Sequence, residues 1–74
     1  MRFDLRLHGR TEDGKRCVAD VSVYANSADS LKHEAHEAAK SAPWHIDDEA
    51  ATWVRDYSAI VVERVELLNK NMGQ

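Results

Sequence analysis

The sequence predicts a small α+β domain with the element order β-β-α-(short α)-β, in which one main helix packs on one face of a three-stranded, mainly antiparallel sheet. Three observations lead to this fold class. Apolar and polar residues alternate over 2–8 and again over 16–24. Alanines recur at helical spacing over 28–42, and β-branched residues cluster over 59–68.

The first two predicted strands form a β-hairpin whose register follows from their faces. Asp-Gly at 13–14 suggests a two-residue turn, but that turn would set apolar residues opposite polar ones along the whole ladder. A three-residue loop over 12–14 restores the agreement, with Gly14 as the left-handed residue of a bulged type I turn. The pairs predicted by this loop are Phe3 with Val23, Leu5 with Val21, Leu7 with Ala19 and, on the outer face, Arg6 with Asp20.

The main helix is predicted to begin after Ser27 and to end near Ala42. The Ser27 hydroxyl can accept a hydrogen bond from a free amide of the first turn, and Asp29 interacts favourably with the helix dipole there. Pro43 disfavours helical backbone at the residue before it. One stripe of this helix is almost entirely alanine, which permits close packing on a sheet; it contains Ala28, Leu31, Ala35, Ala38 and Ala42.

Residues 47–55 are interpreted as a short second helix, and whether this segment is helical stays open. Asp47 would cap it, with two further acidic residues in the first turn. Its apolar side would contain Ala50, Trp53 and Val54.

Residues 59–68 are predicted to form the third strand, because β-branched residues favour extended structure. We expect this strand to pair beside the first, and the strand order stays open. A bulge near Glu63-Arg64 would move the apolar side of this strand. The positions before the bulge are Ile60 and Val62, and those after it are Val65 and Leu67. The spacing of a helix also fits Val61, Val65, Leu68 and Met72.

Length and composition favour a small, self-associating cytoplasmic protein. The 74 residues are predicted to form one domain over 1–70, followed by a frayed tail over 71–74. One cysteine, Cys17, cannot form a disulfide within the chain, and so short a domain often gains stability by association. The net charge of −3 argues against a general nucleic-acid or membrane binder. A free thiol without a signal-peptide pattern fits a reducing compartment.

The candidate metal ligands are His33, His36 and Glu37, which are neighbours on one face of the predicted helix. The zincin pattern requires histidines four residues apart, whereas these are three apart. The same residues also fit a solvated helix face, and we predict no metal and no cofactor. Cys17 falls on the apolar side of its strand and is interpreted as a core residue. Because the sequence has neither a nucleophile elbow nor a glycine-rich phosphate loop, we predict no catalytic residues and no enzyme.

The predicted function is a non-enzymatic protein-interaction or self-associating module, whose partner is a second copy or another protein. Tryptophan and tyrosine are frequent in binding hot spots, and the outer face of the hairpin adds further candidates. The candidate surface residues are Trp44, Trp53, Tyr57, Tyr24, Val18 and Arg6. For the two tryptophans, closure of the hydrophobic core is the alternative role.

Two alternative functions follow from local features. A nucleic-acid-associated or antitoxin-like accessory protein would use the basic residues near the hairpin, which are Arg2, Arg6, Arg10, Lys15 and Arg16. A metal-binding protein would use the helix histidines.

Several segments together resemble small bacterial, plasmid and phage β-β-α-β proteins of the DpnD/PcfM-like pattern. These segments are the hairpin, the run from Val23 to Leu31 with the alanine helix after it, and the run from Asp56 to Val62. The likeness implies the β-β-α-β fold, and it contains no motif from which a functional residue can be transferred. Glu12-Asp13-Gly14 and the alanine helix are similar to HicB-type antitoxin domains, although this chain has no extra strand before the helix.

Overall fold

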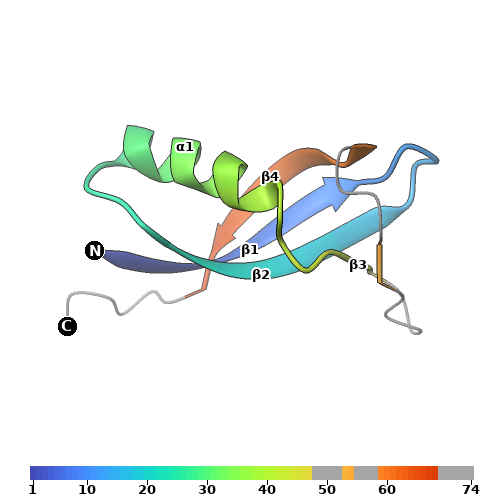
Figure 1. Ribbon diagram of the computed structural model, residues 1–74, viewed down its shortest axis with the longest axis horizontal. Coiled ribbons are helices and arrows are strands. Elements are labelled where there is room, and N and C mark those ends of the chain that lie inside the picture. The colour runs from blue at the N-terminus through green and yellow to red at the C-terminus, as the bar shows by residue number, and fades with distance from the viewer. Residues whose placement is uncertain (48–52, 55–58, 69–74) are drawn as a thin grey trace.

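The computed structural model describes residues 1–47, 53–54 and 59–68, and it confirms the α+β class. Its four strands form one antiparallel sheet in the order β3-β2-β1-β4, and the helix lies across one face of that sheet (Figure 1). The elements are β1 (Arg2–Arg10), β2 (Arg16–Tyr24), α1 (Ala28–Ala39), β3 (His45–Ile46) and β4 (Val61–Leu67).

The hairpin of β1 and β2 has the predicted register, with Leu5 opposite Val21 and Arg6 opposite Asp20. The loop is the predicted three-residue one, because the Thr11 amide donates to the Lys15 carbonyl at 2.9 Å. Gly14 has a φ of 86°, the left-handed conformation that a bulged type I turn needs. Face matching between two alternating strands was therefore enough to determine this register.

Helix α1 begins as predicted and ends earlier than predicted. The Ser27 side chain accepts from the Ser30 amide at 3.2 Å. The last helical residue is Ala39, not Ala42. The amide that would normally bond the Ala39 carbonyl belongs to residue 43, which is a proline and has no N–H. The indole Nε1 of Trp44 donates to that carbonyl instead, at 2.9 Å.

The prediction of three strands is wrong by one, because β3 adds a fourth strand at the edge of the sheet. It pairs with β2 through Cys17–Ile46 and Val18–His45. Two residues are too few to produce a recognisable alternation of apolar and polar side chains. The predicted helix over 47–55 is wrong at Trp53, which forms an isolated antiparallel bridge with His45 instead. Residues 48–52 and 55 of that segment, and the predicted tail over 71–74, lie outside the described residues.

The structure confirms that 59–68 contains a strand beside β1 and that this strand has the predicted bulge. Leu67 lies opposite Leu5 and Val65 opposite Leu7. The register then shifts between His8 and Gly9, which pair with Arg64 and Val62, so Glu63 is the extra residue.

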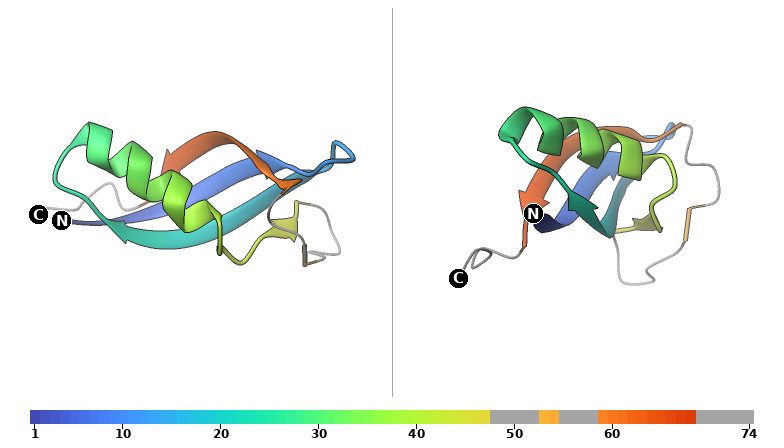
Figure 2. Two further views of the ribbon diagram at one scale, coloured as in Figure 1. Left: turned by 45° about the horizontal axis from the view of Figure 1, so that its top comes forward. Right: turned by 60° about the vertical axis from the view of Figure 1, so that its left-hand side comes forward.

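The hydrophobic core lies between the sheet and α1 and continues beyond the C-terminal end of the helix. Figure 2 shows that α1 covers only part of the sheet and that the hairpin extends past it. Trp44 is fully buried and supplies cover there, within the same cluster as Ala39 and Ala42. The other buried members of that cluster are Leu5, Leu7, Cys17, Ala19, Val23 and Ala35. Cys17 is thus a core residue, and burial raises the pKa of its thiol.

Candidate functional site

The aromatic candidates separate into buried and exposed residues. Trp44 belongs to the core, so its side chain is not available at the surface. Trp53 is 65% exposed and Tyr24 is 72% exposed. Tyr57 lies outside the described residues. Core closure is therefore the role of the first tryptophan, while the second stands at the surface against the ring of His45, with ring centroids 5.5 Å apart.

The outer face of the sheet brings Arg6 and Val18 together with two histidines. Arg6 makes two hydrogen bonds to the Asp20 carboxylate, at 2.8 and 3.2 Å. Val18, which is half-buried, lies opposite His8 on β1 and His45 on β3. The Nδ1 atom of His45 is buried and has no hydrogen-bond partner in the part of the chain that the structure describes.

His8 connects the centre of this face to β4. Its Nε2 atom lies 2.9 Å from a Glu66 carboxylate oxygen and 3.2 Å from a guanidinium nitrogen of Arg64. One ring nitrogen cannot both donate to the carboxylate and accept from the guanidinium. Donation to Glu66 agrees with the lowered pKa of that carboxyl group, whose first cause is the hydrogen bond with His8 and to which nearby Arg64 also contributes. Glu66 thus interacts favourably with both His8 and Arg64.

The Arg6–Asp20 pair predicts a specific acid sensitivity. The hydrogen bonds from Arg6 hold the pKa of Asp20 below its usual value of 3.8. A depressed folded-state pKa stabilises the fold above the unfolded pKa, and this contribution is lost as the pH falls through the folded-state value. We expect Asp20→Asn to lower the melting temperature slightly at neutral pH and to reduce its fall below about pH 4. Glu12→Gln, at an exposed residue of the hairpin loop, is the control. Equal acid profiles for the two variants would contradict this prediction.

The helix histidines lie on the exposed face of α1. His36 Nδ1 is 2.9 Å from the Lys32 carbonyl oxygen, and Glu37 forms an ion pair with Lys40 at 2.9 Å. His33 is exposed on the same helix. Among the described residues, no three His, Cys, Asp or Glu side chains gather into a group that could hold a metal ion.

Most of the basic residues near the hairpin lie against carboxylates. Arg6 binds Asp20, and Arg10 Nε lies 3.2 Å from Glu63. Arg2 and Lys15 have acidic neighbours too, which are Asp4 at 3.1 Å and Asp13 at 3.9 Å. These pairs offset the positive charge on which a nucleic-acid function would depend.

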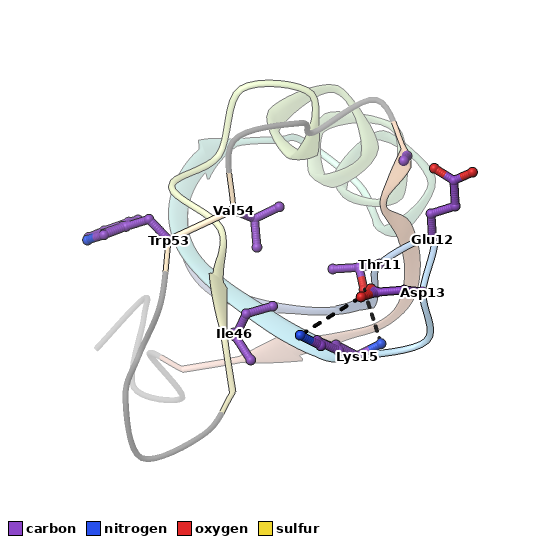
Figure 3. Close-up of a pocket in the computed structure, with 8 residues that line it drawn as sticks. Thr11, Glu12, Asp13, Lys15, Ile46, Trp53 and Val54 are labelled. Atoms are coloured by element: carbon purple, nitrogen blue, oxygen red, sulfur yellow. Dashed lines mark hydrogen bonds and ion pairs between the residues drawn. The ribbon is translucent and has the colours of Figure 1, made fainter.

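A hollow of about 580 Å³ lies between the hairpin loop and the segment around Trp53 (Figure 3). Ile46 and Val54 point into it, whereas Trp53 points away. The polar groups of the loop bond to one another, since Thr11 and Lys15 both contact Asp13. The hollow therefore combines apolar walls with polar loop side chains, of which Thr11, Asp13 and Lys15 already bond to one another.

The free edge of β4 is the feature that the sequence interpretation did not single out. The apolar side chains of β4 and of Leu68 after it are exposed: Val61 at 65%, and Val65, Leu67 and Leu68 at 36–38%. These four are the majority of the seven large exposed hydrophobic residues of the described chain. Val65 and Leu67 also line a groove of about 210 Å³ against Leu31 of α1. The β-branched run over 59–68 was the available signal, but it did not reveal that β4 pairs with β1 alone among the described strands.

Among the described strands, none pairs with the backbone of β4 on that side. The Leu68 amide donates to the Asp4 carbonyl at 2.8 Å, so Leu68 directs its backbone groups to β1. Successive residues of an antiparallel strand direct these groups to opposite sides. Arg64 and Glu66 therefore face β1, whereas Val65 and Leu67 present their N–H and C=O groups at the edge. No strand in the described part of the chain pairs there.

Comparisons with protein-family models, with curated proteins and with solved structures find no match to this chain. The described residues contain no helix that is both long and apolar enough to span a bilayer.

Proposed function

We propose that this chain is a non-enzymatic protein-interaction module that binds its partner by adding a strand to the free edge of β4. The observation that carries this proposal is the coincidence of exposed apolar side chains and unpaired backbone groups on one strand. An edge strand of this kind pairs readily with another chain, and natural proteins usually blunt such edges with charge, proline or a covering segment.

The opposite edge of the sheet is less suited to this role. It consists of β3 and the part of β2 that β3 leaves uncovered. The side chains of that part alternate between the core and the outer face, and the outer ones include Asp20 and Ser22. The apolar side chains Ala19 and Val23 of that part are buried in the core, whereas Val61, Val65 and Leu67 of β4 are exposed. The free edge of β4 is therefore the stronger binding edge.

Photocrosslinking in the native cell tests this proposal. A photoreactive phenylalanine analogue at Val61, the most exposed apolar position of β4, is expected to crosslink one predominant protein. The same analogue at Tyr24, which is also well exposed but lies on β2, two strands away from β4, should not give that product. Val65→Lys should abolish the crosslink, because it places a charge at the apolar edge. The proposal fails if Val61 gives no product, or one that Tyr24 shares and that Val65→Lys leaves unchanged.

A further inference from the structure

We infer that the partner is a second copy of this chain, bound through an antiparallel β4–β4 contact. The two-fold axis of this contact lies midway between the Val65 residues of the two copies, which we call an axis through Val65. This inference rests on the proposed function and names the occupant of the same edge. It is argued from the charge order along β4 and from the position of the bulge.

The charge order determines the register. Arg64 and Glu66 lie on the outer face on either side of Val65, since they pair with His8 and Arg6 of β1. An axis through Val65 sets Arg64 of each copy opposite Glu66 of the other and brings two opposite-charge pairs together. An axis through Arg64 or through Glu66 would set identical charges face to face. Val65 also directs its backbone groups to the edge, so the two central residues can exchange both backbone hydrogen bonds.

The bulge extends the match beyond the charged pairs. If Glu63 stays outside the ladder, as it does against β1, the residues before it shift by one position. Val62 then lies opposite Leu67 of the second copy, and Val61 lies opposite Leu68. The three exposed apolar residues of β4 and Leu68 after it thereby all meet apolar partners, with Val65 opposite its own copy. In a continuous ladder without the bulge, Glu63 would oppose Leu67 instead, which would place unlike residues together.

The contact is expected to be weak and reversible. One pair of short strands buries less area than a standard stable interface of about 1,600 Å². Both α1 helices lie on the same face of the joined sheet, because a two-fold axis perpendicular to a sheet preserves its faces. The grooves between α1 and β4 therefore meet at the axis and add apolar contact. We expect a dissociation constant in the micromolar range or weaker.

Sedimentation of the whole chain and its charge variants tests the inference. The wild type should pass from monomer to dimer between about 1 µM and 1 mM. Arg64→Glu alone and Glu66→Arg alone each set like charges opposite one another and should weaken association about tenfold. An equimolar mixture of these two variants restores both opposite-charge pairs and should form heterodimers with affinity near that of the wild type. Arg16→Glu is the control, since this exposed residue begins β2, two strands away from the contact.

Two results would overturn the inference. A wild type that stays monomeric throughout this range excludes the second copy as partner. In that case a different protein crosslinked at Val61 would still uphold the proposed function, because that function requires only that a partner binds this edge. This register is excluded if neither charge variant weakens the dimer. It is also excluded if the two variants, when mixed, show no preference for each other. Circular dichroism of every variant establishes that it is folded before its association is compared.

Discussion

Replacing Trp44 with alanine is expected to destabilise the fold by about 3–5 kcal/mol, the range for removing a large buried aromatic side chain. Trp44 is fully buried, and its indole N–H satisfies the Ala39 carbonyl at the end of α1. The variant loses both the packing and this hydrogen bond. Because domains of this size have free energies of unfolding of roughly 4–11 kcal/mol, a large share of the stability is lost. Urea unfolding followed by circular dichroism measures the change.

Trp53→Ala is the matched control for this prediction. It removes the same side chain from a position that is 65% exposed, where the lost contact is mainly the ring of His45. We expect a change of less than about 1 kcal/mol, in line with most surface substitutions. Equal losses in the two variants would show that burial of Trp44 does not carry the stability assigned to it.

Adding a single methyl group at Gly9 is expected to cost about 1–3 kcal/mol, the usual effect of overpacking. A Cβ atom there would lie 2.9 Å from the Val61 carbonyl oxygen, 2.9 Å from Ile60 Cγ2 and 3.1 Å from the Trp44 ring. The first of these is backbone of the neighbouring strand, so relief of the clash requires β1 and β4 to move apart. Gly9→Ala should therefore lower the urea midpoint and weaken the β1–β4 ladder.

Gly14 provides the comparison that separates crowding from backbone conformation. A Cβ atom at Gly14 meets nothing within 4 Å, but its φ of 86° disfavours alanine. Asparagine tolerates this conformation, so Gly14→Asn should be closer to the wild type than Gly14→Ala. At Gly9 the larger asparagine should be no better than alanine. A rescue by asparagine at Gly9 would contradict the crowding explanation.

The candidate site was only partly predictable from the sequence. Alternation places Arg6 and Val18 on the outer face, and the hairpin register brings Asp20 to Arg6. No local pattern says that His8 meets Glu66, because those residues are 58 positions apart. The exposure of β4 is a property of strand order, which a single strand cannot encode. The most accessible apolar edge therefore became visible only in the folded chain.

The sequence by itself determined the features that depend on neighbouring residues: the hairpin register, the left-handed Gly14, the start of α1 at Ser27 and the bulge at Glu63. Each follows from a period, a turn or a cap whose geometry is local. Tertiary structure decided which tryptophan is buried and where the fourth strand pairs. These depend on contacts between distant segments, whose energies the local pattern does not specify.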